Sequence, residues 1–558
     1  MKHWRINLVL LLIILFSAVI VGRLIFIQVF KYQYWRALAQ GQQKFFAFLQ
    51  EERGEIFFQD KTNLAINQNF DLVYLVPNEI KNPEETADIL SSILNLDKSS
   101  ILEKTKKENF YELIKRKLSK EEVENLKNLN SPGVYLGQES GRYYPFGDLA
   151  SQVVGFLGGD NNGQYGIEGF YDDVLQGKDK VLEKEMGPAG YFVNVTANPF
   201  EEGSDIILTL DYNIQFMAEK LLKKAKEDLD IKEGEIIVIE PNSGKILALA
   251  NFPNFDPNQY SQVTNLEVFQ NSSIQKIFEP GSVFKPITMA AALDQGKITP
   301  QTTYVDEGFV KIGGYKISNY GGHVWGKRTM TEVLEKSINT GAVFAEQQMD
   351  HDIFQDYIER FGIFERTYID LQGEVSSPNK EFKTGHEVNF ATASFGQGIG
   401  MTSLQLVRAI SVIANGGKLV RPYIVDKILE NGKIIETKPE IQNPSVISQS
   451  TASQVVLMMV NVIEQGFGKS AGIPGYYIAG KTGTAQISWS ALGINKEGYS
   501  DKTIQTFAGF APALDPQFLI LIKLYNPKAK TAEYSAAPIF KELAKYIIDY
   551  WQIPPDHE

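Results

Sequence analysis

The chain opens with a long apolar run. The segment Ile6–Gly22 carries no charged residue, and apolar positions resume after Arg23 as far as Phe30. A helix rises about 1.5 Å per residue, so this stretch spans about 37 Å, more than a hydrocarbon core of about 30 Å. A cleaved signal peptide is the alternative, but no small-x-small cleavage site follows the run. We therefore predict an uncleaved, single membrane-spanning anchor.

The rest of the chain has no second apolar run of that length. The expected organisation is a cytoplasmic tail (1–5), the anchor (6–30) and a large body outside the cytoplasmic membrane. Positive residues are nearly balanced across the anchor, but long domains translocate largely regardless of charge.

Residues 40–210 have the pattern of one irregular, mainly β module. Glycines are dense between 141 and 203, which is typical of turns between short strands. Extended segments with apolar positions are predicted at Lys44–Leu49, Gly54–Phe58 and Phe70–Val76. Between residues 78 and 130 the pattern changes to Lys/Glu-rich helices at Pro83–Leu94 and Lys120–Leu129, and we interpret them as a solvated insertion.

Residues 211–558 alternate between strand and helix patterns. A helix is predicted at Ile214–Ala225, and a closing helix at Pro538–Trp551 carries its apolar residues on one face. Strands are predicted at Glu235–Ile239, Lys245–Ala250, Ile504–Phe510 and Gln517–Tyr525, with a long helical middle between the two pairs. This order indicates an α/β (α+β) domain, an antiparallel sheet flanked by helices. A catalytic site should lie where the helical middle meets the sheet.

The amino-acid composition excludes several classes of function and several kinds of catalytic group. The chain has 558 residues and a net charge of −12, which argues against a general nucleic-acid binder because such proteins are basic. It has no cysteine and five histidines. A thiolate zinc site, a disulfide framework and a cysteine nucleophile are therefore excluded. Serine paired with lysine is the nucleophilic combination to search for.

The pattern Ser-x-x-Lys occurs three times, beginning at Ser273, Ser282 and Ser377. In a helix these two residues share a face, so the lysine amine can take the serine proton. Only Ser282 has a suitable setting, because Pro-Gly precedes it and a buried helical run follows Lys285. Pro286 is tolerable there only in the first helical turn. Ser273 and Ser377 are interpreted as surface serines.

Two shorter motifs follow. Ser337-x-Asn339 comes after a short helix opened by the capping box Thr329-x-x-Glu332, so a loop there can present a hydroxyl and an amide. Lys-Thr-Gly occurs at residues 383 and 481. Only the second copy lies in a strand pattern, where lysine flanked by threonine hydroxyls is a good receptor for a carboxylate.

Other enzyme motifs fail on their context. Gly468–Gly472 matches a nucleophile elbow, but a helical pattern precedes it where a strand is required. His386-Glu387 begins a zinc-protease string, yet Phe390 stands where the second histidine belongs. No nucleotide-binding loop is visible, and we predict no cofactor and no metal.

The ordered set Ser282-x-x-Lys285, Ser337-x-Asn339 and Lys481-Thr482-Gly483 resembles the penicillin-binding-protein and serine β-lactamase superfamily. The wider strings are similar to class B penicillin-binding proteins over nearly the whole chain: Glu279–Pro286, Leu208–Asp211, Gly396–Gly398 with Thr402 and Gln405, Ala414–Gly417, Gly480–Ala485, and, in the pedestal module, Arg53–Ile56, Arg142–Pro145 and Gly166–Glu168. Two features depart from the family pattern: Phe58-Gln59 replaces its Asp-Arg pair, and the charged stretch 78–130 matches nothing in it.

The resemblance implies a transpeptidase domain at 211–558, a pedestal (dimerisation-type) domain at 40–210, and a serine-type D,D-transpeptidase of the D-Ala-D-Ala carboxypeptidase class. Such an enzyme cross-links peptidoglycan stem peptides and is inhibited by β-lactams. The strings Lys481–Ala485 and Thr506–Pro512 look more like the division branch than the elongation branch. By the same analogy, the partners are a membrane-embedded glycan polymerase and other division proteins.

The resemblance also assigns roles. Ser282 is the nucleophile, Lys285 its base, Ser337 a proton relay and Asn339 a holder of the substrate amide. Lys481, Thr482 and Thr484 bind the terminal carboxylate beside Gly483, and the backbone N–H groups of Ser282 and Thr484 stabilise the oxyanion. Two alternatives stay open: a membrane-tethered serine β-lactamase and a catalytically silent division scaffold.

Overall fold

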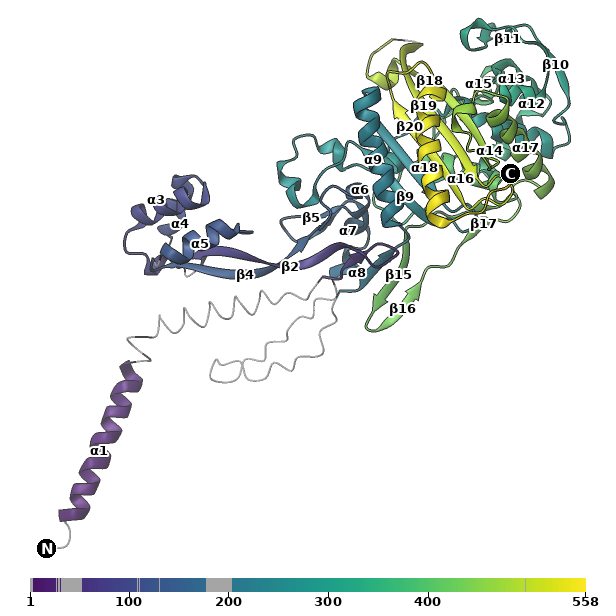
Figure 1. Cartoon of the computed structure of the whole chain (residues 1–558). Coiled ribbons are helices and arrows are strands. Elements are labelled where there is room, and N and C mark those ends of the chain that lie inside the picture. Colours follow the sequence, from purple (N-terminus) through teal and green to yellow (C-terminus); the bar gives the residue numbers. More distant parts are fainter. Residues whose placement is uncertain are drawn as a thin grey trace. The chain divides into compact units, whose positions relative to one another are not determined.

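The computed structural model describes residues 4–26, 28, 31, 53–107, 109, 111–129, 131–176, 203–496 and 498–557 (Figure 1). The predicted strand Lys44–Leu49 lies outside the described residues. The chain divides into two compact units, the first containing Asn67–Tyr143 and the second containing Arg53–Ile66 and the described chain from Tyr144 onward. Because the second unit takes residues from both sides of position 210, the boundary between the two predicted domains stays a prediction.

The N-terminal apolar run forms one helix, α1 (Trp4–Ile25). Its segment Leu8–Ile25 has a mean hydropathy of 2.9 and no buried residue. By length and composition it is a candidate membrane span, as predicted, although a signal sequence would have the same properties.

The first unit has a small core of its own. Strand β2 (Asn63–Leu75) pairs with β3 (Glu112–Lys115) and β4 (Val134–Tyr143). Helices α3 (Pro83–Leu94) and α5 (Lys120–Leu129) have the predicted bounds, and α4 (Lys98–Thr105) lies between them in sequence. The expectation of a solvated insertion is wrong for one face of these helices: Leu90, Leu94 and Leu126 are buried in a cluster with Val73 and Leu75 of β2.

In the second unit, residues Asn63–Ala65 at the beginning of β2 pair with β1 (Ile56–Phe57), and the strand order continues through β7 (Asp205–Leu208), β15 (Val425–Glu430) and β16 (Lys433–Glu436). Short helices accompany them: α6 (Ser151–Val154), α7 (Gly166–Phe170) and α8 (Asp172–Gln176). Residues 40–210, expected to be mainly β, are therefore mixed where the structure describes them. The paired strings Arg53–Ile56 and Gly166–Glu168 meet in a buried ion pair between Arg53 and Glu168, 2.7 Å apart.

The body of the second unit is a five-stranded antiparallel sheet. Its strands lie in the order β18 (Ala479–Ser488), β19 (Tyr499–Ala511), β20 (Phe518–Tyr525), β8 (Glu233–Ile239) and β9 (Ile246–Phe252). The four predicted strands are confirmed. They bring the two ends of the domain sequence together and leave β18 at an edge of the sheet.

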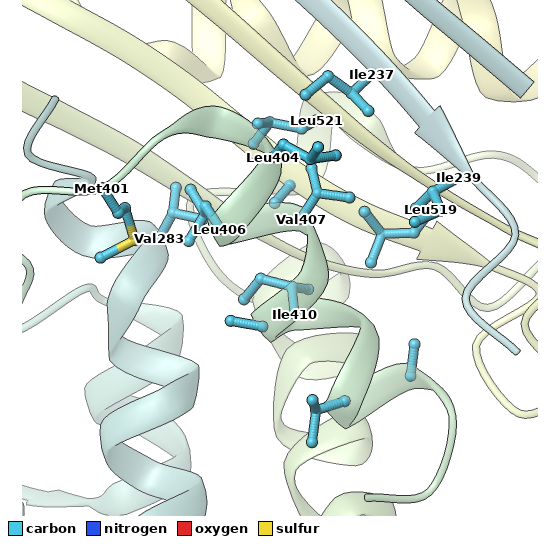
Figure 2. Packing of buried hydrophobic residues seen from close by; sticks show 14 of the residues in the cluster. Ile237, Ile239, Val283, Met401, Leu404, Leu406, Val407, Ile410, Leu519 and Leu521 are labelled. Atoms are coloured by element: carbon cyan, nitrogen blue, oxygen red, sulfur yellow. The ribbon is translucent and has the colours of Figure 1, made fainter. Parts of the chain in front are cut away.

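Helices cover both faces of this sheet (Figure 1). Alternate strand residues point to opposite faces, and Ile236 and Val238 pack with α9 (Tyr212–Leu229) and α18 (Ala536–Trp551). Ile237 and Ile239 pack on the other side, against α16 (Ser403–Ala414), whose residues are all buried. Figure 2 shows Leu404 and Val407 of α16 beside Leu519 and Leu521, with Val283 close to Leu406 and Met401.

The helical middle lies between β9 and β18. Besides α16, it includes the helices α10 (Ser272–Gln275), α11 (Lys285–Asp294), α12 (Met330–Glu335), α13 (Asn339–Gln347), α14 (His351–Arg360), α15 (Glu387–Ala393) and α17 (Gln449–Glu464), and the 3₁₀ turn η5 (Gly281–Phe284). A hairpin excursion, residues 303–329, stands out from it and consists of β10 (Thr303–Asp306), β11 (Phe309–Ile312), β12 (Tyr315–Ser318) and β13 (Gly326–Thr329). The outer pair β10–β13 encloses the inner pair β11–β12 in the sequence.

Candidate active site

Ser282 lies on the turn that leads into a buried helix. The 3₁₀ turn η5 carries Ser282, and Lys285 is the first residue of α11 with Pro286 in the first turn, as the sequence required. Gly281 has φ = +61°, a conformation that glycine adopts without strain, and its N–H donates to the carbonyl of Gly396. The Nζ of Lys285 is 3.1 Å from the Ser282 hydroxyl, so base and nucleophile are in hydrogen-bond contact.

Ser337 and Asn339 lie on the other side of Lys285. Ser337 connects α12 to α13 with φ = +53°, an uncommon conformation for a residue with a side chain. Lys285 donates to the Ser337 carbonyl at 2.6 Å and to Asn339 Oδ1 at 2.8 Å, and its Nζ is 3.3 Å from Ser337 Oγ. The amide of Asn339 donates in turn to the Ser318 carbonyl of the hairpin excursion.

Strand β18 supplies the third side of the site. Lys481 is fully buried, and its Nζ donates to Ser337 Oγ at 2.9 Å. Gly483 allows the strand to approach η5: a Cβ there would lie 2.7 Å from Val283 Cγ2 and 3.1 Å from the Pro280 carbonyl. The hydroxyl of Thr484 accepts from the Ala532 N–H at 3.2 Å and keeps its own proton to donate.

Ser337 Oγ therefore lies between two lysine nitrogens. Burial, together with the nearby charge of Lys481, holds the pKa of Lys285 well below its ordinary value. Burial also lowers the pKa of Lys481, to about 7. Desolvation disfavours the charged form of an amine, and a second ammonium nearby adds to the effect. Near neutral pH, Lys285 is the amine that can accept a proton, and Lys481 is the one that can carry charge.

Of the predicted site residues, the structure brings Ser282, Lys285, Ser337, Asn339 and Lys481 into one continuous hydrogen-bonded set. Thr482, Gly483 and Thr484 follow on the same strand. In the described part of the chain, no group of three histidine, aspartate or glutamate side chains is placed to hold a metal ion.

The decoy motifs lie elsewhere. Ser273 is not a surface residue: it is fully buried and donates to Asn251 Oδ1. Sequence reasoning missed this because the partner is on β9, far along the chain. Ser377 is half-buried beside Asn379, and Lys383-Thr384 forms a 3₁₀ turn with no strand. Gly468 follows helix α17, as expected.

The sequence also gave no sign of the hairpin excursion that contacts Asn339. Its strands are four residues long, too short for alternation to stand out, and it contacts Asn339 through the Ser318 carbonyl and the side chain of Asn319, which belong to no motif.

Two protein families match this chain. The family described as the penicillin binding protein transpeptidase domain matches residues 234–545, and the penicillin-binding protein dimerisation domain matches residues 49–208. The chain therefore belongs to the penicillin-binding-protein transpeptidase family.

Two curated relatives span most of the chain. Stage V sporulation protein D of Bacillus subtilis is 34% identical over 88% of this chain and 76% of its own length. A peptidoglycan D,D-transpeptidase FtsI homolog of Mesostigma viride is 30% identical over 99% of this chain and 96% of its own. The crystal structure of penicillin binding protein 3 from Mycobacterium tuberculosis has a TM-score of 0.70 at 27% identity, covering 90% of this chain and 97% of that one. Further structures of that protein are complexes with aztreonam and ampicillin.

Proposed function

We propose that this chain is a peptidoglycan D,D-transpeptidase that cross-links stem peptides through an acyl-enzyme on Ser282. The observation that carries the proposal is the contact of Lys285 with Ser282 Oγ, extended through Ser337 to Lys481. The name of the Mesostigma relative and the β-lactam complexes of the mycobacterial protein support the same reaction class.

The mechanism begins at Ser282. Its Oγ attacks the carbonyl carbon between two terminal D-alanines, and neutral Lys285 accepts the hydroxyl proton. Backbone N–H groups of Ser282 and Thr484 stabilise the oxyanion, and losing one such donor typically costs about 3–4 kcal/mol. Ser337 passes a proton to the departing D-alanine amine as the ester forms. The amine of a second stem peptide then attacks the ester carbonyl and forms the cross-linking amide, while the proton that this amine loses returns through Lys285 to Ser282 Oγ as the ester bond breaks. The reaction is a serine-type acyl transfer of the D-Ala-D-Ala carboxypeptidase class.

The terminal carboxylate of the donor peptide meets a receptor made by β18. Lys481 contributes a positive charge, and the hydroxyls of Thr482 and Thr484 contribute donors along the strand. Charge-assisted hydrogen bonds of this kind are roughly twice as strong as neutral ones. Asn339 holds the substrate amide on the opposite side of Ser282. A β-lactam presents the same acyl group and carboxylate, which makes it an inhibitor.

We place the protein in the cytoplasmic membrane, anchored by α1, with the rest of the described chain outside. The division branch is supported by the FtsI homolog among its relatives, and the expected partners are a membrane-embedded glycan polymerase and other division proteins.

Intact mass of the protein recovered from membranes tests the anchor, because a cleaved signal would remove α1. Loss of those residues from the mature protein would contradict it.

The decisive test of the reaction is intact-protein mass after treatment with penicillin. The wild-type protein should gain one penicilloyl adduct, and Ser282→Ala should gain none. Ser377→Ala is the matched control, since it removes a serine from another Ser-x-x-Lys motif, and it should be acylated like the wild type. An adduct on Ser282→Ala would exclude our nucleophile.

Persistence of the adduct separates a transpeptidase from a β-lactamase. Among the described residues, none of the hydrogen bonds of Ser282, Lys285, Ser337 or Lys481 goes to a carboxylate that could activate a hydrolytic water. We therefore expect the adduct to persist and a chromogenic cephalosporin to be hydrolysed slowly. Rapid turnover would favour the β-lactamase, and no reaction at all would favour a silent scaffold.

A further inference from the structure

The N-terminus of α13, which carries Asn339, is capped from a distant part of the chain. The residue at the N-cap position is Ile338, which has no side-chain hydrogen bond to offer. The first N–H groups of a helix have no partner within the helix. Here Asn319 Oδ1 accepts from the N–H of Asn339 at 3.0 Å and from the N–H of Thr340 at 3.2 Å.

Asn319 is in turn oriented by a buried carboxylate. Its Nδ2 lies 3.0 Å from each of the two oxygens of Asp306. The side-chain amide can have only one orientation, because a flip would set its oxygen against the carboxylate and its NH₂ against the helix N–H groups. The position of Asn319 Oδ1 is therefore determined by Asp306.

Asp306 is itself fixed in place by burial and by several hydrogen bonds. It is 2% exposed and lies at the end of β10. Besides Asn319, it accepts from Thr340 Oγ1 at 2.7 Å, from the N–H of Trp325 at 2.7 Å and from the N–H of Gly308 at 3.0 Å. Burial raises the pKa of this carboxyl, but the hydrogen bonds from Thr340, Trp325, Gly308 and Asn319 outweigh it and lower the pKa overall. Asp306 is therefore an ionised acceptor that joins both arms of the excursion to α13.

We infer that Asp306, acting through Asn319, is a positioning residue that presents Asn339 to Lys285 and the substrate; this rests on the proposed function. The excursion contacts Asn339 twice, through its N–H and through its Nδ2, which donates to the Ser318 carbonyl at 3.1 Å. With its N–H and its Nδ2 both held, Asn339 is oriented so that its Oδ1 accepts the hydrogen bond from Lys285. A misplacement of about 1 Å in such a group can slow a reaction about a hundredfold.

A second contact keeps the excursion docked when this network is cut. Ile312 and Ile317 of the inner hairpin are buried against Ala342 and Val343 of α13 and against Phe395. Removing the charge of Asp306 without changing its shape should therefore leave the fold in place and loosen only the cap.

The test measures the second-order rate of acylation by a fluorescent penicillin in purified full-length protein. Asp306→Asn should react about tenfold to a hundredfold more slowly than the wild type. Asp370→Asn is the matched control: that carboxylate is 5% exposed and accepts from the N–H groups of Ile424 and Val425, away from the site. It should lose similar thermal stability and keep the wild-type rate.

A double-mutant cycle with Asn339→Ala separates positioning from general destabilisation. If Asp306 acts through Asn339, adding Asp306→Asn to Asn339→Ala slows acylation little further. If the two losses multiply, the inference is overturned. The double variant Asp306→Asn, Asn319→Asp exchanges the two side chains, so that an amide donor again faces a carboxylate acceptor. It should recover part of the acylation rate that Asp306→Asn loses.

The remaining outcomes are distinct. Should Asp306→Asn fail to fold, Asn319→Ala, which removes the cap alone, must show the same loss in rate and the same non-additivity with Asn339→Ala. A wild-type rate in Asp306→Asn, while Ser282→Ala is inert, overturns the inference and leaves the proposed function intact. A wild-type protein that penicillin does not acylate overturns both.

Discussion

At the scale of single residues, Ser337 connects the two lysines of the site because its hydroxyl contacts both of their side-chain nitrogens. Its hydroxyl is 2.9 Å from Lys481 Nζ and 3.3 Å from Lys285 Nζ. Ser337→Ala leaves both amines buried with one acceptor fewer and removes the proton relay. General acid–base catalysis contributes about a hundredfold or more, so we expect acylation by penicillin to slow by about that factor. Stopped-flow fluorescence measures it, with Ser377→Ala as the control. A loss of less than threefold would remove Ser337 from the mechanism.

The pH profile should report Lys481. Burial lowers its pKa to about 7, so this amine is charged below about pH 7 and neutral above. Because the free protein must present a charged Lys481 to an anionic ligand, the second-order acylation rate should fall as the pH rises through about 7. A cephalosporin esterified at its carboxylate carries no negative charge for Lys481 to bind. Its acylation rate should therefore not fall as the pH rises through about 7. A falling limb of equal size for both ligands would show that another group controls it.

At the scale of elements, the approach of β18 to η5 sets the distance between Lys481 and Ser282. A Cβ on Gly483 would lie 2.7 Å from Val283, which belongs to η5, and 3.1 Å from the carbonyl of Pro280, the residue before it. Gly483→Ala should force the strand away and slow acylation about tenfold or more.

Gly480→Ala is the matched control on the same strand. There the new methyl group meets the ring of Phe507, 2.6 Å away, which packs on the opposite face of the sheet. Thermal melts should show that both substitutions destabilise the protein, whereas the acylation rate should fall only for Gly483→Ala. Equal losses in rate would mean that the effect is one of general stability.

How much the sequence predicts depends on how local each signal is. Helices α3 and α5 have the predicted bounds because each segment carries its own apolar periodicity, and α3 also begins with a proline, Pro83. The Ser282 turn was equally readable from its Pro-Gly pair. Ser273 was misread, and Asp306 and Asn319 were not found, because their partners lie on other elements and leave no local pattern. The antiparallel sheet, by contrast, was predictable from the strand patterns near both ends of residues 211–558, although the order of its strands was not predicted.

At the scale of the whole molecule, the two units have separate cores, and this separates stability from catalysis. Leu90 is fully buried in the first unit, together with Val73 and Leu75. Leu90→Ala should destabilise that unit by about 2–5 kcal/mol, the usual cost of such a cavity. Ser282 belongs to the second unit, so the acylation rate should stay at the wild-type value.

Calorimetry can resolve this, because a protein with two cores need not unfold in one transition. Bound penicillin should raise only the melting transition of the second unit, and Leu90→Ala should lower only the other. Leu543→Ala, in the core beneath α18, is the reciprocal variant and should lower the transition that penicillin raises. If Leu90→Ala lowered the penicillin-sensitive transition instead, the two cores would unfold as one, and changes in the first unit would reach the active site through global stability.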